Sequence, residues 1–216
     1  MQQIPHTSAQ TLHNSNQYTL LDTLHHNEIK DFVVQELAAH ALWARIANMY
    51  QIGGLLAFML AGFRAFMPFF VHKESTQLMY LLFAMAFSFS FLIVIHEFIH
   101  ALAYKVIGAK NISFGMNLRK FVFYVQAHQQ VLSYGNMKVV ALAPAVVVAA
   151  ITVVGMLVFY NQPMFFAFAA VFGLHSLFCA GDMGMLCYFE NRKEKEIVTY
   201  DDKTNNCSYF YEKKGN

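Results

Sequence analysis

The chain has 216 residues, of which 57% are hydrophobic and only 13% are charged. Soluble domains average roughly 45–50% apolar and about 25% charged residues, so the composition argues against a soluble globular domain. The net charge is +2, which is too small and too scattered for a nucleic-acid-binding surface, and we expect no nucleic acid partner. The three cysteines form no paired framework, which argues against a disulfide-stapled secreted domain.

The first 49 residues lack the positively charged region, short apolar stretch and cleavage site of a signal peptide, so we expect none of them to be removed. Apolar residues then recur at three- and four-residue steps, which predicts an amphipathic helix at the membrane surface. These residues are Ile29, Phe32, Val33, Leu37, Ala41, Trp43 and Ile46. Residues 1–49 are therefore predicted to form a cytosolic N-terminal segment with a juxtamembrane helix.

Four apolar blocks follow, each about as long as the roughly 20 residues that a membrane-crossing helix needs. They cover approximately residues 51–71, 78–103, 139–160 and 163–189. We therefore predict a mainly α-helical, polytopic membrane protein with about four transmembrane helices in a membrane domain of residues 50–189.

The positions of Lys and Arg predict the orientation, because short cytoplasmic loops are enriched in them. The connection between the second and third blocks holds five, the tail of residues 190–216 holds six and the N-terminal segment holds two. The connection between the first and second blocks holds only Lys73. Both termini are therefore predicted to be cytosolic.

Two stretches outside the blocks predict short cytosolic β-hairpins. In the first, residues 112–118 alternate between apolar and small or polar, and residues 121–125 are mostly β-branched or aromatic. In the second, a polar turn over residues 201–206 separates residues 198–200 from residues 209–211 within the charged tail.

Ionisable residues inside a bilayer are costly and usually functional. The four blocks contain six of them: Arg64, His96, Glu97, His100, His175 and Asp182. Residues 96–100 read HEFIH, an HExxH motif. On a helix its two histidines lie one turn apart on one face and can reach one metal ion, while Glu97 can take a proton from metal-bound water. The alternative is a polar cluster that ties helices together by hydrogen bonds.

A catalytic zinc site normally has three protein ligands and one open position. Depth in the membrane favours Asp182 as the third ligand, because it lies eight residues inside the predicted cytosolic edge, between the five of His100 and the nine of His96. His175 lies about 10 Å deeper on nearly the same helical face. Asp182 could instead make a packing hydrogen bond or a salt bridge to Arg64.

Three further residues in the blocks have several interpretations. His175 could orient Asp182, contact substrate or be a satisfied core histidine. Cys179 lies on the same face and could ligate a soft metal, although a buried cysteine is usually a small hydrophobic residue. Arg64 is interpreted as a side chain that extends outward towards the membrane surface.

The segment HEFIHALA at residues 96–103, followed by Gly108, resembles membrane-embedded zinc metalloproteases of the site-2 protease type. The layout is also similar to that of the putative zincin peptidases, a family of small bacterial membrane proteins. Further similarities are the ALAP sequence ending at Pro144 and the pair Gly181-Asp182. The resemblance implies zinc held by His96, His100 and Asp182, with Glu97 as the catalytic base, in a bacterial cytoplasmic (inner) membrane.

The sequence therefore predicts a zinc-dependent, membrane-embedded metallopeptidase with a cytosol-facing site and a membrane or membrane-proximal protein substrate. The hairpin of residues 112–125 could hold the substrate as an added edge strand. One alternative is a non-proteolytic membrane scaffold, or an inactive relative that retains a metal site. Another is an electron-transfer bundle with His96 and His175 as axial haem ligands. Two imidazoles and a carboxylate also suit iron.

Overall fold

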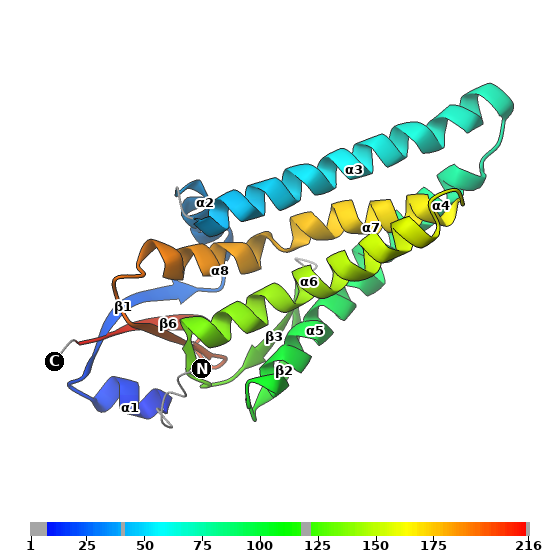
Figure 1. Cartoon of the computed structure of the whole chain (residues 1–216). Helices are drawn as coiled ribbons and strands as arrows, with labels where there is room; N and C mark the ends of the chain where they lie inside the picture. Colours follow the sequence, from blue (N-terminus) through cyan, green and yellow to red (C-terminus); the bar gives the residue numbers. More distant parts are fainter. Residues whose placement is uncertain (1–7, 40–41, 118–121, 215–216) are drawn as a thin grey trace. The chain divides into compact units, whose positions relative to one another are not determined.

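The computed structural model describes residues 8–39, 42–117 and 122–214. Figure 1 shows the chain coloured along the sequence. The chain divides into two compact units. The first unit comprises Met1–Ala44, Glu97–Ala143 and Gly181–Asn216, and the second comprises Arg45–His96 and Pro144–Ala180. Several helices pass from one unit into the other.

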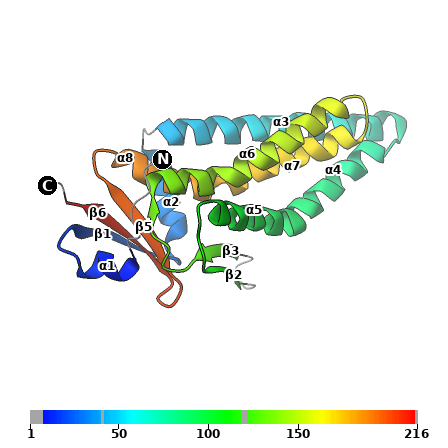
Figure 2. The same ribbon diagram turned by 60° about the horizontal axis from the view of Figure 1, so that its bottom comes forward.

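A four-stranded antiparallel sheet organises the first unit. Its strand order is β1-β6-β5-β4, and Figure 2 shows β1, β6 and β5 side by side. The strands are β1 (Tyr18–His25), β6 (Cys207–Lys213), β5 (Ile197–Asp202) and β4 (Leu132–Ser133). The central pair confirms the hairpin expected in the tail, with Tyr200 opposite Tyr209.

Strand β1 was not expected from the sequence. It pairs with β6 along its whole length, so the N-terminal segment and the tail share one sheet. Only Leu24 is buried along β1, and the other side chains are at least partly exposed. A strand without a buried face lacks the apolar alternation by which strands are recognised.

A second, two-stranded sheet pairs β2 (Ile112–Asn117) with β3 (Val122–Ala127) in antiparallel register. Phe114 lies opposite Val125. This pairing confirms the first predicted hairpin, although Leu118 and Phe121, at its predicted inner ends, lie outside the described residues.

Helices α1 (Ala9–Asn14) and α2 (Ile29–Ala38) complete the N-terminal part of the first unit. The predicted amphipathic helix begins at Ile29, as expected, but α2 ends at Ala38, and the predicted member Ala41 lies outside the described residues. Trp43 and Ile46 belong instead to the next helix, α3 (Leu42–His72), which continues through the expected boundary near residue 50 without a break.

Among the described residues, three helical stretches are long and apolar enough to cross a membrane. They are α3, the run Thr76–Val106 and α6 (Tyr134–Val158). The second run contains α4 (Thr76–Phe87), one turn of π-helix at Ser88–Leu92 and α5 (Ile93–Val106). π-helical turns inside α-helices occur frequently at functional sites, and this one directly precedes the helix that carries HExxH.

The fourth apolar block is two helices rather than one straight span. α7 (Met164–Phe178) and α8 (Ala180–Asn191) meet at Cys179 with a bend of 43°. Counted as one broken span, the pair brings the number of candidate spans to four. The bend places Asp182 in the first turn of α8, where the helix dipole favours a negative charge.

Within the second unit, α3 and α7 lie side by side and approach closely at small residues (Figure 1). A Cβ atom added to Gly173 would lie 2.6 Å from the Gly54 carbonyl oxygen. One added to Gly54 would overlap the side chain of Ser176, whose Cβ would be 2.8 Å away. Close approach of two backbones through small residues is the usual way in which helices associate in membranes.

We expect Gly54→Ala to lower the free energy of unfolding by about 1–3 kcal/mol, because the added methyl group forces α3 and α7 apart. The adjacent Gly53→Ala is the matched control: a Cβ atom there meets nothing within 4 Å. This control should leave stability unchanged or raise it by up to about 1 kcal/mol through helix propensity. Thermal unfolding in detergent measures both variants, and equal effects would contradict the tight crossing.

Candidate metal centre

The HExxH motif lies on α5, as its spacing requires, with His96 and His100 four residues apart on one helical face. His96 is the last residue of the second unit in this helix, and Glu97 and His100 belong to the first. Both histidines are buried, with 7% of each exposed. Two imidazoles are therefore placed in a largely apolar interior, which requires that their nitrogens have partners.

In the first unit, His100 is held between a backbone carbonyl and a carboxylate. Its Nδ1 lies 3.0 Å from the Val140 carbonyl oxygen, and its Nε2 lies 3.2 Å from Oδ1 of Asp182. A carbonyl oxygen can only accept a hydrogen bond, so Nδ1 carries the hydrogen and donates it. The lone pair of the neutral ring is then at Nε2, which faces Asp182.

This arrangement fits a bound cation. A neutral Nε2 and a carboxylate oxygen are both acceptors, so they repel at 3.2 Å unless a positive charge accompanies them. A proton on Nε2 would supply that charge, and so would a metal ion ligated by both atoms. In protein metal sites the second nitrogen of a ligating histidine usually donates to a carbonyl or carboxylate, as Nδ1 does to Val140. The donor set of imidazole and carboxylate suits zinc.

Glu97 is tied to the two-stranded sheet. Its Oε2 accepts a hydrogen bond of 2.9 Å from the backbone N–H of Val125 on β3. Successive residues of an antiparallel strand point their N–H groups to opposite sides, so Val125 directs its N–H away from β2. The outer edge of β3 therefore lies directly beside the Glu97 carboxylate.

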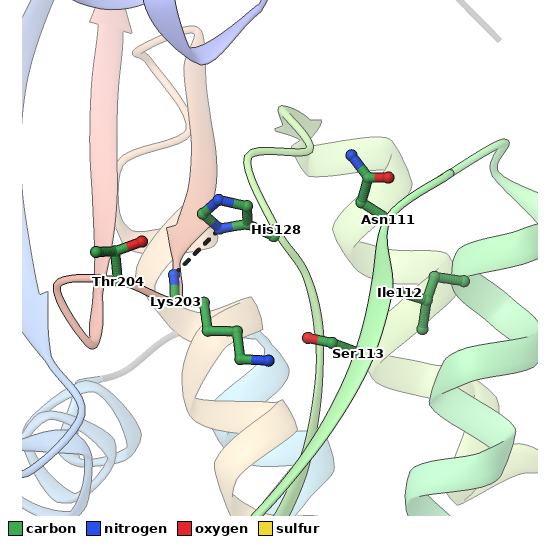
Figure 3. Close-up of a pocket in the computed structure, with 6 residues that line it drawn as sticks. All are labelled: Asn111, Ile112, Ser113, His128, Lys203 and Thr204. Carbon is green, nitrogen blue, oxygen red and sulfur yellow. Dashed lines mark hydrogen bonds between the residues drawn. The ribbon is translucent and has the colours of Figure 1, made fainter.

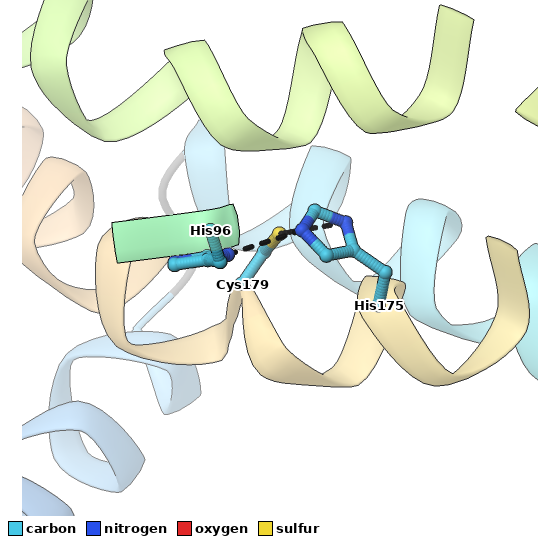
Figure 4. A group of neighbouring side chains, drawn as sticks. All are labelled: His96, His175 and Cys179. Carbon is cyan, nitrogen blue, oxygen red and sulfur yellow. Dashed lines mark hydrogen bonds between the residues drawn. The ribbon is translucent and has the colours of Figure 1, made fainter. Parts of the chain in front are cut away.

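In the second unit, His96 belongs to a buried cluster with His175 and Cys179 (Figure 4). Nδ1 of His96 lies 3.0 Å from Nε2 of His175, and Sγ of Cys179 lies 3.6 Å from Nδ1 and 4.0 Å from Nε2 of the same ring. Neither His175 nor Cys179 is exposed. From the sequence, His175 was interpreted as a residue that orients Asp182, contacts substrate or is a satisfied core histidine, so its direct pairing with His96 is a new observation.

The two units thus group the predicted residues differently. The first brings Glu97, His100 and Asp182 to the same part of the fold, and the second brings His96 together with His175 and Cys179. Arg64, on α3, is exposed, in agreement with a side chain that extends outward.

A cavity lined mostly by polar residues lies elsewhere in the described part of the first unit (Figure 3). It is open, has a volume of about 590 Å³ and is lined by Asn111, Ile112, Ser113, His128, Lys203 and Thr204. The Lys203 N–H donates to Nδ1 of His128 at 3.3 Å. No predicted catalytic or metal-binding residue lines this cavity, so we do not assign it to the metal centre.

Asp202 orders the β5–β6 turn beside this cavity. Its Oδ1 accepts hydrogen bonds from the N–H groups of Thr204, at 2.8 Å, and Asn205, at 3.3 Å. Burial acts to raise the pKa of the Asp202 carboxyl, but these hydrogen bonds outweigh it, and the pKa lies below its ordinary value. Asp202 is therefore ionised at neutral pH and stabilises the β5–β6 turn through these hydrogen bonds.

Sequence reasoning missed one feature of the centre and gave too little weight to another. The Val125 N–H belongs to the backbone, so the residue type at this position does not indicate that it donates to Glu97. Cys179 had a signal that was undervalued: it follows His175 by four residues, the same spacing that His100 has from His96. A thiol and an imidazole at this spacing share one helical face.

Comparison with known proteins gives one match. Residues 89–196, which are half of the chain, match a family model described as "Putative zincin peptidase". The matched region contains the HExxH motif, the two-stranded sheet, His175, Cys179 and Asp182. Neither a curated protein nor a solved structure matches the chain.

Proposed function

We propose that this chain, which belongs to the family of putative zincin peptidases, is a zinc-dependent peptidase whose metal ligands are His96, His100 and Asp182. The observation that carries the proposal is the contact between His100 Nε2 and Asp182 Oδ1. His96 joins them as the third ligand because α5 places it one helical turn before His100. Zinc bound there would polarise the scissile carbonyl and lower the pKa of a water molecule to about 7.

Glu97 is the general base in this proposal. Its carboxylate takes the proton of the attacking water and passes it to the leaving amine, as the middle glutamate of HExxH does in metallopeptidases. The Val125 N–H holds the carboxylate in one orientation. A base held in this way is positioned before the substrate arrives.

The outer edge of β3 is the proposed substrate template. An extended peptide that adds to this edge would place one of its carbonyl groups against the Val125 N–H. It would then compete with Glu97 for that donor and release the carboxylate next to the bound peptide. For a transmembrane substrate, main-chain bonds to β3 replace those lost when its helix unwinds.

His175 acts as a positioning residue. When Nδ1 of His96 donates to Nε2 of His175, the lone pair of His96 is at Nε2 and is available to zinc. The pairing therefore gives a partner to the tautomer of His96 that the metal site needs. This role differs from the orientation of Asp182 considered from the sequence.

Insertion in a membrane is also part of the proposal. The helices expose large apolar side chains over much of their length, among them Phe63, Phe83, Phe91, Val106 and Leu157. Such a surface suits lipid and not water. The distribution of Lys and Arg supports cytosolic termini and a site on the cytosolic side, and the site-2 protease resemblance supports a bacterial cytoplasmic membrane with a membrane-embedded protein substrate.

The alternative functions fare differently. His96 and His175 contact each other directly, which leaves no space for a porphyrin between them and disfavours the haem bundle. A scaffold that retains the metal site shares all the geometry described above. Only activity separates the scaffold from the peptidase.

We expect the detergent-purified protein to contain about one zinc ion per chain, measured by mass spectrometry. His100→Ala and Asp182→Ala should each weaken zinc binding by about 100-fold or more, because each removes a ligand. His128→Ala is the matched control, since that histidine lies at the polar cavity, and it should bind zinc like the wild type. A wild-type protein without zinc after loading would contradict the proposed centre.

Glu97→Gln should retain zinc and thermal stability but lose peptide hydrolysis by about 10²–10⁴-fold, because glutamine cannot accept the proton. Unstructured casein and detergent-solubilised transmembrane peptides serve as substrates, and mass spectrometry detects cleavage. The exposed Glu194→Gln is the control and should cleave like the wild type. Equal cleavage by Glu97→Gln and the wild type would rule out Glu97 as the base.

Val125→Pro removes the N–H at the edge of β3 without removing a β2–β3 hydrogen bond, since that N–H donates to Glu97. We expect the KM for cleaved peptides to rise by about 5–10-fold, the equivalent of one hydrogen bond, with zinc content unchanged. Val125→Ala keeps the N–H and controls for the side chain. If the two variants have the same KM, substrate does not bind to this edge.

A further inference from the structure

We propose that His96, His175 and Cys179 form a second metal position, which holds a thiophilic divalent cation and competes with the catalytic position for His96. The inference deepens the proposed function and rests on it only through the shared His96. All three residues lie in the second unit. Their candidate ligand atoms lie within 4.8 Å of one another.

The distances agree with tetrahedral coordination. Zinc bonds of about 2.0–2.1 Å to nitrogen and 2.3 Å to sulfur imply ligand separations of roughly 3.3 Å between two nitrogens and roughly 3.6 Å between nitrogen and sulfur. The two ring nitrogens are 3.0 Å apart, and Sγ of Cys179 is 4.0 Å from Nε2 of His175. These two separations differ from the tetrahedral values by about 0.3 and 0.4 Å, and all three ligand atoms lie within 4.8 Å of one another.

The local structure holds these ligands together. His175 and Cys179 are four residues apart, and the Cys179 N–H donates to the His175 carbonyl oxygen at 3.2 Å, so the helical turn between them is closed. Cys179 is also the residue at which α7 gives way to α8. The ligands on α7 thus repeat the spacing of the HExxH histidines on α5, and each helix supplies one face of the cluster (Figure 4).

The ligand types define the cation. Two imidazoles and a thiolate are softer than two imidazoles and a carboxylate, so the second position favours thiophilic ions such as Zn²⁺, Co²⁺ and Cd²⁺ over Mg²⁺ or Ca²⁺. Binding forms a metal–sulfur bond and releases the thiol proton of Cys179 to solvent. No oxidant or reductant takes part.

The shared histidine makes the two positions mutually exclusive. A neutral imidazole has one lone pair, which is at Nε2 when Nδ1 carries the hydrogen and at Nδ1 in the other tautomer. The catalytic position uses Nε2 of His96, and the second position uses Nδ1, which faces His175. A cation at the second position therefore takes a ligand from the catalytic zinc, so thiophilic ions would inhibit the enzyme by displacing its own histidine.

The test uses Co²⁺, because a thiolate bound to Co²⁺ gives a charge-transfer band in the near ultraviolet. The catalytic position is first disabled by Asp182→Ala and, in a separate protein, by His100→Ala. We expect both variants to bind about one Co²⁺ per chain at the second position when the ion is in excess, and to show the thiolate band. Addition of Cys179→Ser to either variant should abolish the band and lower Co²⁺ affinity at least tenfold.

Cys187→Ser is the matched control, because Cys187 is an equally buried cysteine on α8 that packs against Ala44 in the first unit. Addition of Cys187→Ser should leave both the band and the Co²⁺ affinity unchanged. Absence of the thiolate band from both disabled variants, or a band that survives Cys179→Ser, would overturn the second position. Failure of the catalytic proposal is seen separately, in the Cys179→Ser single variant, which lacks the thiolate but should still bind about one zinc ion per chain through His100 and Asp182.

Discussion

The centre depends on one constraint: two imidazoles and their carboxylate partner must be satisfied in an apolar interior. His100 satisfies this constraint because the Val140 carbonyl oxygen lies next to its Nδ1 and the Asp182 carboxylate lies next to its Nε2. The carbonyl determines which nitrogen carries the hydrogen, and this in turn requires a positive charge between Nε2 and the carboxylate. The bend at Cys179 contributes to this geometry, because it places Asp182 in the first turn of α8, where the helix dipole stabilises a carboxylate that water does not fully solvate.

The same helix connects the metal centre to a strand edge. Glu97 lies between the two histidines in the sequence, and its carboxylate accepts the outward-facing N–H of Val125. The proposed base and the proposed substrate template are therefore joined by one hydrogen bond in the first unit. A backbone donor suits this purpose because its direction is set by the pairing of β3 with β2, and the chain needs no additional side chain for it. A substrate that forms strand pairs with β3 is aligned and gains access to the base in the same step.

Much of this could be predicted from the residues themselves. Apolar block length located the helices, and the cost of burying ionisable groups indicated the HExxH residues and Asp182 as candidates for the site. Of these, His100 and Asp182 are in contact in the first unit. The tail hairpin could be predicted from the aromatic and β-branched residues on both sides of its turn.

Strand β1 could not be recognised, because only Leu24 is buried along it and the strand is held by backbone pairing with β6. The break at Cys179 was also hidden, because the residues on both sides of it are mostly apolar. The Val125 donor was hidden because it belongs to the backbone.

The bond between His96 and His175 shows why a count of ligands is not sufficient to describe such a centre. A histidine has two nitrogens, and the partner of one determines what the other can do. Nδ1 of His100 donates its hydrogen to the Val140 carbonyl oxygen. Because a carbonyl cannot donate a hydrogen bond, the other tautomer would lose this interaction, and the lone pair of the neutral ring remains at Nε2. His96 instead faces another histidine, which can either donate or accept, so both tautomers of His96 keep a hydrogen-bond partner. The HExxH motif thus contains one histidine whose neutral ring is held in a single tautomer and one whose tautomer can change. Cys179 lies beside the His175 ring that faces the second of them. Competition between the two proposed metal positions therefore acts through His96, while His100 and Asp182 keep their contact with each other.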